Sequence, residues 1–324
     1  MKAAIRGERG LELVDIEAPR PGPEEVLVRV RACALNRADL GVLAGHMHGT
    51  IGGPGTVLGM EWAGEVVETG SAVNGFAPGD RVMCSGRAAI AQYAVADVGR
   101  TMKLPDASMS FEQGATLPVA LQTMHDAVVT NGRLKAGESV LIQGASTGVG
   151  LMALQVAKAM GAGLVIGTST NAARRARLAA FGADLALDSS DERWVAQALE
   201  ATGGRGVDLI VDQLSGRVAN QNMAAAAVLG RIVNVGRLAG TRAEFDFDLH
   251  ALRRIDYIGV TFRTRSVQEV RDLNARMMAD LWPHLRAGRL ALPIDSVFAF
   301  ERTGEAYERM RANEHFGKIV VTMA

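Results

Sequence analysis

The segment Gln143–Ala162, QGASTGVGLMALQVAKAMGA, follows the apolar stretch ESVLI at 138–142 and changes from glycine-rich to helix-like along its length. A glycine-rich turn between a strand and a helix can hold a dinucleotide, because the helix N-terminus offers free N–H groups and a positive dipole end. The usual G-x-G-x-x-G pattern is not met, since Ala145 and Thr147 stand where its first two glycines would be. The segment alone therefore leaves a dinucleotide cradle and a simple tight turn both open.

The sequence around this turn alternates between short apolar strands and helical segments. We predict strands at 139–144, 164–168, 185–188, 206–214, 231–236 and 256–262, and helices at 148–162, 171–183, 191–203 and 216–230. Six apolar strands separated by helices are typical of a parallel, doubly wound α/β sheet with both faces covered. This context favours the dinucleotide cradle.

The helix that follows the turn has apolar residues at helical spacing. Val149, Met152, Val156 and Met160 are expected to face the sheet. Gly148 would let the backbone approach a ligand closely, and Gly150 would let the helix pack against the strand.

The first third of the chain has a different pattern, typical of an antiparallel β-rich domain. In 24–36, EEVLVRVRACALN, valines alternate with charged residues, and 63–70 and 79–86 are further short strands bounded by turn residues. After Phe262 a helical stretch at 267–288 precedes strands at 296–300 and 316–323. We expect this tail to return to the first domain, which gives a catalytic domain at 1–120, a dinucleotide-binding domain at 121–262 and a C-terminal return at 263–324.

Composition excludes several classes of function. The 324 residues carry 35 basic and 35 acidic side chains, so no net charge attracts nucleic acid or an anionic membrane. The N-terminal stretch MKAAIRGERG is charged throughout, which argues against a signal peptide, and we expect a cytoplasmic protein. The two cysteines, Cys33 and Cys84, cannot build a disulfide framework or a four-cysteine zinc site and are expected to be buried thiols.

The end of the second strand bears on cofactor choice. NAD enzymes of this architecture place a carboxylate there for the ribose 2′-OH. Here Thr168, Ser169 and Thr170 replace it, and Arg174 and Arg175 follow. Hydroxyls and cations suit a 2′-phosphate through charge-assisted hydrogen bonds, so we predict NADPH as the cofactor. The alternative for the two arginines is a solvated helix face.

Seven motifs follow one another along the chain. They are ACALNRADL (32–40), LGMEWAGEVVETG (58–70), FAPGDRV (76–82), LPVALQT (117–123), GASTGVGLMALQVAKAMGA (144–162), GRIVNVG (230–236) and FGKIVV (316–321). In this order they resemble the motifs of the medium-chain dehydrogenase/reductase superfamily, and in particular those of its zinc-independent NADPH:quinone oxidoreductases. NRADL in the first motif is similar to the p53-inducible quinone oxidoreductase subgroup.

The resemblance implies a Rossmann domain inserted in a GroES-like catalytic domain, with the active site between them. It also implies a homodimer joined through the last Rossmann strand, at 256–262. Zinc members have a cysteine near Asn36 and a histidine at Met60, and neither residue here can replace those ligands. His46 and His48 have no third ligand at a suitable spacing, so we predict no metal site.

Several site residues are implied by the same resemblance. Asn36 would lie against substrate and nicotinamide, although it could instead be the cap of the helix that begins at 37. Lys318 would lie near the cofactor, with a surface lysine as the alternative. The full set implied for the cofactor is Thr123, Ala145, Ser146, Thr147, Gly148, Val149, Ser169, Arg174, Asn234, Val235, Gly236, Phe262, Arg263, Thr264 and Lys318.

Hydride transfer from NADPH to a small-molecule quinone is the predicted chemistry. The subgroup has a tyrosine where this chain has Met47, so His46 or His48 could donate a proton instead. Two alternatives stay open: reduction of an activated C=C bond in an enone or enoyl compound, and a low-turnover NADPH-binding sensor. We predict neither a nucleic-acid partner nor a membrane role.

Overall fold

A computed structural model describes residues 1–323 and divides the chain into two compact units. The first comprises 1–119, 262–286 and 291–324, and the second comprises 120–261 and 287–290. The terminal residue 324 lies outside the described part. The long segment of the second unit begins inside α3 (Pro118–His125) and ends at Thr261. The domain limits expected from the sequence stay a prediction.

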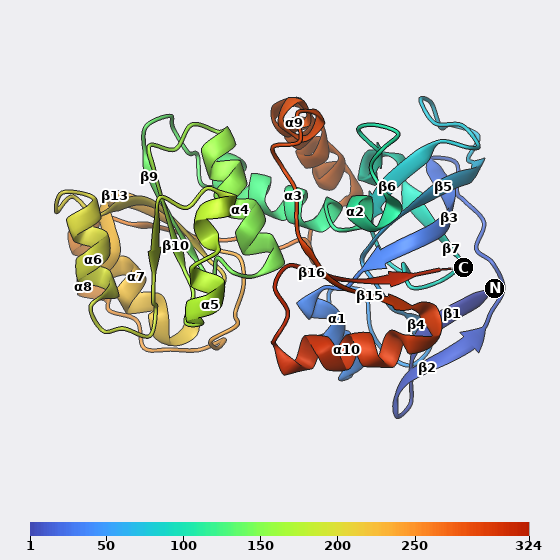
Figure 1. Ribbon diagram of the computed structural model, residues 1–324, viewed down its shortest axis with the longest axis horizontal. Helices are drawn as coiled ribbons and strands as arrows, with labels where there is room; N and C mark the ends of the chain where they lie inside the picture. The colour runs from blue at the N-terminus through green and yellow to red at the C-terminus, as the bar shows by residue number, and fades with distance from the viewer. Residues whose placement is uncertain (324) are drawn as a thin grey trace. The chain divides into compact units, whose positions relative to one another are not determined.

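The first unit is built on two sheets whose strands are antiparallel except for the β15–β16 pair (Figure 1). Its seven-stranded sheet has the order β15-β16-β3-β5-β6-β8 with β7 paired to β3, and a small sheet has the order β2-β1-β4. The strands are β1 Lys2–Gly7, β2 Gly10–Asp15, β3 Glu25–Ala34, β4 Thr56–Val57, β5 Glu61–Thr69, β6 Arg81–Ser85, β7 Tyr93–Asp97, β8 Thr101–Lys103, β15 Ile294–Ala299 and β16 Lys318–Thr322. The helices are α1 Arg37–Leu43, η1 Val98–Arg100, α2 Phe111–Ala115, α9 Val267–Arg286, η5 Phe300–Arg302 and α10 Thr303–Ala312.

The C-terminal tail belongs to this first unit because β16 pairs with β3. Val321 lies opposite Cys33 in an antiparallel register, and β15 then adds to β16 in parallel. Val26, Val28 and Val30 of β3 are buried, as their alternation predicts. Cys33 and Cys84 are buried free thiols, which confirms that expectation.

The second unit is a six-stranded, wholly parallel sheet with the order β11-β10-β9-β12-β13-β14. Its strands are β9 Ser139–Gln143, β10 Leu164–Thr168, β11 Leu185–Leu187, β12 Val207–Asp212, β13 Ala226–Asn234 and β14 Asp256–Gly259. Its helices are η2 Asp126–Thr130, α4 Gly148–Ala159, α5 Ala172–Arg175, η3 Leu178–Phe181, α6 Trp194–Ala201, η4 Gly216–Val218, α7 Ala219–Ala225 and α8 Phe247–Arg253. The predicted doubly wound α/β class is confirmed.

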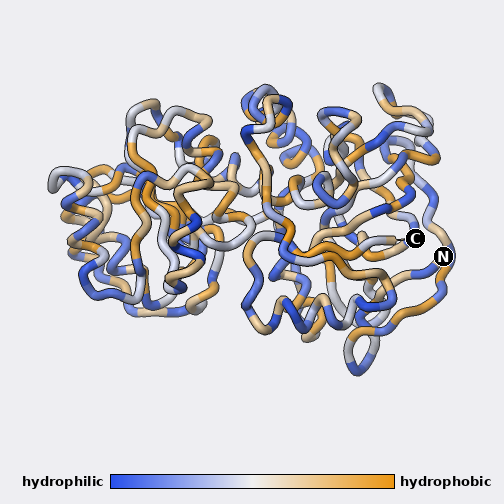
Figure 2. Tube along the Cα trace, viewed as in Figure 1, coloured by the Kyte–Doolittle hydropathy of each residue, from blue (hydrophilic) through white to orange (hydrophobic). Residues whose placement is uncertain are grey.

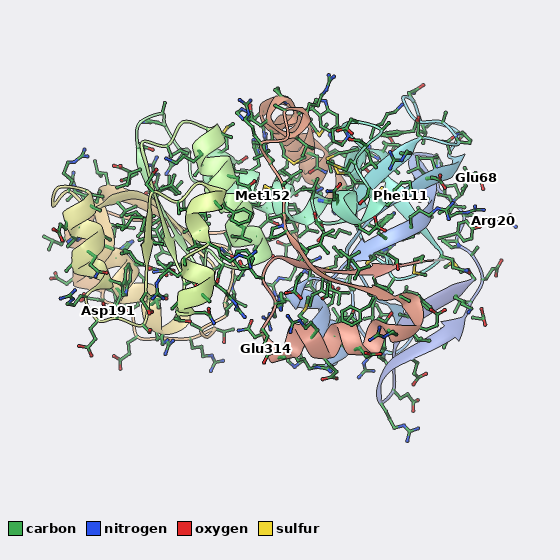
Figure 3. All side chains as sticks on the ribbon, viewed as in Figure 1. Arg20, Glu68, Phe111, Met152, Asp191 and Glu314 are labelled. Atoms are coloured by element: carbon green, nitrogen blue, oxygen red, sulfur yellow. The ribbon has the colours of Figure 1, made fainter. Side chains whose placement is uncertain are left out.

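The helices of this unit cover both faces of its sheet. In Figure 1, α4 and α5 lie on one side of the strands, and α6, α7 and α8 lie on the other. The strands form an apolar band in Figure 2, whereas the outer turns are hydrophilic. The exposed charged side chains of Arg20 and Glu68 lie at the outer edge of the first unit in Figure 3.

Two details of the predicted helices are wrong. The segment 171–183 is not one helix but the short α5 and the 3₁₀ turn η3. Helix 216–230 ends at Ala225, and β13 begins at Ala226, which pairs with Val207 of β12. Of the four residues expected to face the sheet, Met152 and Val156 are fully buried, and Val149 and Met160 are half-buried.

Candidate active site

The turn between β9 and α4 has the geometry of a close cradle. Gly144 adopts a φ of +70°, a conformation that suits glycine. A Cβ on Gly150 would lie 2.5 Å from the Gly144 carbonyl oxygen, so the helix packs onto the turn without room for a side chain. Thr147 caps α4, since its Oγ1 accepts the Gly150 N–H at 3.0 Å and donates to Gln213 Oε1 at 2.8 Å.

The predicted cofactor residues of this turn are not equally accessible. Ala145 is fully buried and donates its N–H to Thr168 O at 2.8 Å, so its side chain cannot meet a ligand. Ser146, Thr147, Gly148 and Val149 are half-buried. The hydroxyl oxygens of Ser146 and Ser169 lie 2.9 Å apart, which joins the turn to the end of β10.

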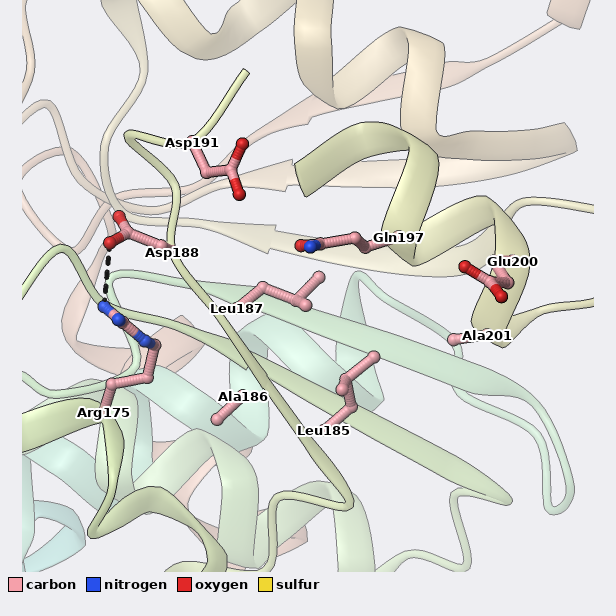
Figure 4. A pocket seen from close by; sticks show the side chains of 9 residues that line it. All are labelled: Arg175, Leu185, Ala186, Leu187, Asp188, Asp191, Gln197, Glu200 and Ala201. Atoms are coloured by element: carbon pink, nitrogen blue, oxygen red, sulfur yellow. Dashed lines mark hydrogen bonds and ion pairs between the residues drawn. The ribbon is translucent and has the colours of Figure 1, made fainter. Parts of the chain in front are cut away.

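A carboxylate does approach the end of β10, although it comes from the end of β11. Arg175 Nη1 donates to Ser169 O at 2.7 Å and to Asp188 Oδ2 at 3.0 Å (Figure 4). Hydrogen bonds from Ser190, together with Arg175, lower the pKa of Asp188. Arg175 and Asp188 border a pocket of ≈520 Å³ between β11 and α6. Asp188 follows β11 and not β10, where the acid of NAD enzymes is expected, so its place in the sequence did not single it out.

The loops after β12 and β13 meet backbone to backbone. Val235 N–H donates to Asp212 O at 2.8 Å, and a Cβ on Gly236 would lie 2.5 Å from Gln213 O. Ser215 Oγ donates to Gly236 O at 2.6 Å and accepts a hydrogen bond from Asn234 Nδ2. The predicted cofactor segment 234–236 is therefore held from the β12 side by Ser215, a residue that no sequence motif singles out.

These features fit a bound dinucleotide. The strand order reverses between β9 and β12, and ligands of open α/β sheets bind outside the carboxyl ends of strands at such a switch point. The turn at 144–150, the hydroxyls at 146 and 169, and the paired loops at 212–216 and 234–236 all lie at that edge. Helix α4 is 12 residues long and adds the positive end of its dipole there.

The first unit holds a buried polar network around Asn36. Glu61 is fully buried and Lys318 is 5% exposed, and their Oε1 and Nζ atoms lie 2.6 Å apart. Asn36 Nδ2 donates to the same Glu61 Oε1 at 2.9 Å, and Lys318 Nζ donates to Asn36 Oδ1 at 2.9 Å. The second Glu61 oxygen accepts the Val119 N–H at 2.8 Å.

This network bears on the alternatives for two residues, a surface position for Lys318 and a helix-cap role for Asn36. Lys318 is buried, so the surface-lysine alternative is wrong. Asn36 does occupy the N-cap position of α1, and its backbone N–H donates to Asp39 Oδ2 at 2.8 Å. Its side chain, however, contacts Glu61 and Lys318, so the cap position and the amide contacts coexist.

Burial shifts the acidity of two groups beside this network. Burial raises the pKa of Asp39 to about 7, against the lowering effects of the Asn36 N–H and the Lys318 charge. Burial also raises the pKa of the Cys33 thiol well above its usual value, and the nearby Asp39 and Glu61 carboxylates add to this. Cys33 is therefore an unreactive thiol at neutral pH.

The two candidate histidines lie in the loop after α1. His46 is exposed, and His48 is half-buried, with its backbone bridged to Ile51. Burial lowers the pKa of His48, and the Arg263 charge lowers it further. The loop passes close to the tail, because a Cβ on Gly49 would lie 2.9 Å from Arg263 O. Within residues 1–323 no three His, Cys, Asp or Glu side chains gather in an arrangement suited to a metal ion.

The remaining predicted positions are accessible. Three of them are half-buried: Thr123 on α3, Arg174 on α5, and Phe262 in the segment after β14. The other two, Arg263 and Thr264, are exposed. The Arg265 guanidinium lies 5.3 Å from the centre of the Phe262 ring. Glu61, which the sequence argument missed, carried one usable signal: a carboxylate inside the apolar strand 58–67.

Comparison with known proteins places both units in one superfamily. A family model described as the alcohol dehydrogenase GroES-like domain matches residues 22–106, and one described as zinc-binding dehydrogenase matches residues 148–278. The expected GroES-like domain is thereby confirmed.

Individual relatives are similar over nearly the whole chain. A highly reducing polyketide synthase of Emericella nidulans is 28% identical over 318 residues, which cover 95% of this chain but only 12% of the synthase. The solved quinone oxidoreductase of Pseudomonas syringae pv. Tomato DC3000 is 27% identical, with a TM-score of 0.86 and 99% of both chains covered. The CurF ER cyclopropanase from the curacin A biosynthetic pathway is 26% identical, with a TM-score of 0.85, and covers 100% of this chain and 99% of its own.

No helix among residues 1–323 is both long and apolar enough to cross a membrane. The sheet order, the cradle after β9 and the two family models agree on one kind of enzyme, an oxidoreductase that uses a nicotinamide cofactor. The chain belongs to the medium-chain dehydrogenase/reductase superfamily of oxidoreductases.

Proposed function

We propose that this protein is an NADPH-dependent reductase that transfers a hydride to a quinone without a metal ion. The observation that carries the proposal is the environment of Asn36. In zinc members a cysteine ligand occupies this position, and here an amide is fixed by the buried Glu61–Lys318 pair. The cation beside the amide is the Lys318 ammonium, so the chain supplies positive charge from its own side chain.

The geometry leaves Asn36 able to contact a substrate. Asn36 is half-buried, whereas its partners Glu61 and Lys318 are almost fully enclosed. One N–H of the amide is committed to Glu61, and the other makes only a long contact of 3.5 Å to Ala34 O. An amide neither loses nor gains a proton near neutral pH, so it can orient a carbonyl oxygen over a wide pH range.

NADPH is proposed as the cofactor because hydroxyls and arginines surround the end of β10. When bound, NADPH supplies the hydride, and the protein supplies position and electrostatics. The turn at 144–150 and the α4 N-terminus would hold the pyrophosphate. Ser169 and Arg174 would meet the 2′-phosphate, while Arg175 is already paired with Asp188.

Asn36 would orient the quinone carbonyl for attack. A quinone that accepts a hydride becomes a hydroquinone anion, and water can protonate its oxygen. The chain therefore needs to bind and orient the acceptor but does not need a dedicated acid for this substrate.

The test is anaerobic turnover of NADPH and NADH with a panel of acceptors. We expect oxidation of NADPH by ortho- or para-quinones, a clear preference over NADH, and slower turnover with simple enones. Turnover of NADPH with activated alkenes and not with quinones would contradict the quinone proposal. Binding of NADPH without turnover by any acceptor would support the low-turnover sensor instead.

A second candidate is reduction of an activated C=C bond, in an enone or an enoyl compound. It is favoured by the similarity to a polyketide synthase whose name describes it as highly reducing. Hydride addition at the β-carbon gives an enolate, which needs a hydrogen-bond donor at oxygen and a proton for carbon. Asn36 could provide the first and His46 the second.

We also propose that two copies pair through β14. This strand is the edge of the six-stranded sheet, and an uncovered edge presents unpaired backbone groups. The Val260 N–H bonds inward to Asn234 O, so by the two-residue alternation the Gly259 N–H points outward. A Gly259→Pro variant removes this donor, and a Cβ there meets nothing within 4 Å. Sedimentation should give a dimer for the wild type and a shift toward monomer for the variant; an unchanged dimer would contradict this pairing.

A further inference from the structure

Ser215, directly after β12, adopts a backbone conformation that is almost exclusive to glycine. Its φ is 56° and its ψ is −156°, and its side chain is almost fully buried. A residue with a Cβ is strained in this region, and such strain persists only where the surrounding contacts impose it. Strained residues of this kind cluster at ligand-binding and catalytic sites.

Two sets of hydrogen bonds impose this conformation, one to Asp212 of β12 and one to the segment 234–236. Asp212 Oδ1 accepts the N–H groups of Leu214 and Ser215, each at 2.9 Å. The Ser215 hydroxyl then bridges the next loop, where it donates to Gly236 O at 2.6 Å and accepts from Asn234 Nδ2. The Ser215 side chain therefore fixes both the side-chain amide of Asn234 and the backbone carbonyl of Gly236.

A glycine at 215 would reach the same backbone conformation without strain. What a glycine lacks is the hydroxyl that holds Gly236 O and Asn234. The presence of a strained serine is therefore explained by its hydroxyl contacts, and these contacts act on the segment that lies at the carboxyl ends of β12 and β13, next to the switch point.

We propose that Ser215 is a positioning residue that sets the Asn234–Gly236 backbone for the nicotinamide end of the cofactor. The proposal rests on the proposed function, because it takes NADPH as the ligand. Ser215 acts through Asn234 and Gly236 and need not touch the cofactor itself. A merely structural role would affect every part of the bound dinucleotide equally, whereas this role affects the nicotinamide end alone.

The experiment compares two ligands in three variants of the full chain. Ser215→Ala keeps the strain and removes the hydroxyl, whereas Ser215→Gly removes both and is the variant least able to disturb folding. Leu229→Gly is the matched control, because Leu229 also has a positive φ, 63°, but its side chain is exposed on β13. The ligands are NADPH and 2′-phospho-ADP-ribose, which lacks nicotinamide, and calorimetry gives the Kd of each.

We expect both Ser215 variants to raise the Kd of NADPH by about fivefold to tenfold, as for the loss of a buried hydrogen bond. The Kd of 2′-phospho-ADP-ribose should stay within about twofold in both, and Leu229→Gly should bind both ligands like the wild type. Wild-type NADPH affinity in Ser215→Gly, or an equal loss for both ligands, would overturn the proposal. A wild-type protein that does not bind NADPH would overturn the proposed function as well, so the two failures are distinguishable.

Discussion

The Lys318 ammonium and the Glu61 carboxylate form a buried ion pair of 2.6 Å in the first unit. The pair joins β16, near the end of the chain, to β5, and Asn36 contacts both members. A buried ion pair is costly to break, because removal of one partner leaves an uncompensated charge away from water. The pair therefore ties the orientation of the Asn36 amide to the stability of the unit.

Lys318→Met should lower the free energy of unfolding by about 3–5 kcal/mol, because the buried Glu61 carboxylate loses its ionic partner. The double variant Lys318→Met/Glu61→Gln should recover much of this loss, since no buried charge remains. Urea unfolding at neutral pH measures both. A double variant no more stable than Lys318→Met would show that the charge is not the cause.

Asp39 should make the protein less stable as pH rises from about 4 to 7. Burial raises its pKa from 3.8 to about 7 in the folded state, so the folded protein binds a proton that the unfolded chain has released. The stability contributed by this protonation is complete below the unfolded pKa and is lost as pH rises through the folded pKa, at about 1.4 kcal/mol per pH unit at most. Above pH 7 the loss is constant.

The comparison that isolates this effect is Asp39→Asn, which cannot titrate and can still accept the Asn36 N–H. The difference in unfolding free energy between variant and wild type should shift in favour of the variant between pH 4 and pH 7. A difference that does not change with pH would contradict the raised pKa of Asp39.

Arg174 and Arg175 should differ in their effect on cofactor choice. Arg175 is bonded to Asp188 and to Ser169 O, and Arg174 precedes it on α5. We expect Arg174→Ala to raise the Kd of NADPH about tenfold, the size of one charge-assisted hydrogen bond, and to leave NADH unchanged. Arg175→Ala should affect both cofactors by a similar, smaller factor, because it loosens the end of β10.

Asp188→Asn serves as the complementary variant. It removes the carboxylate that competes for Arg175 and should strengthen NADPH binding relative to NADH. Fluorescence titration with each cofactor measures these ratios. An unchanged ratio of NADPH to NADH affinity in all three variants would contradict a 2′-phosphate site at this edge.

Much of the fold could be predicted because it depends on local periodicity. The six strands of the parallel sheet are short apolar runs, and the glycine at 150 packs helix on strand as its spacing predicts. The alanine-rich end of 216–230 was mispredicted as helix, since β pairing with β12 outweighs the intrinsic helix preference of alanine there. Length and composition cannot show such a tertiary preference.

The site was less predictable because its key contacts join residues far apart in sequence. Asp188 reaches the β10 edge from β11, and Ser215 owes its strain to Asp212 and Gly236. Neither residue belongs to a motif with a fixed spacing. The pairing of Lys318 with Glu61 spans 257 residues, and only the return of the C-terminal strand to β3 brings them together.

His46 is the candidate proton donor for an alkene substrate, and its role should depend on the acceptor. His46 is exposed in the loop after α1, whereas burial and Arg263 lower the pKa of His48, which favours a neutral, poorer acid. With an enone or enoyl acceptor, His46→Ala should lower kcat by about 10²-fold, the usual size of general acid catalysis, and His48→Ala should have a much smaller effect. With a quinone acceptor neither variant should change kcat, because water can protonate the hydroquinone oxygen. His46→Gln is the matched control for size and polarity, and steady-state kinetics over pH 5–9 measures all three variants. Equal rates in the wild type, His46→Ala and His48→Ala with an alkene acceptor would exclude a histidine donor in this loop.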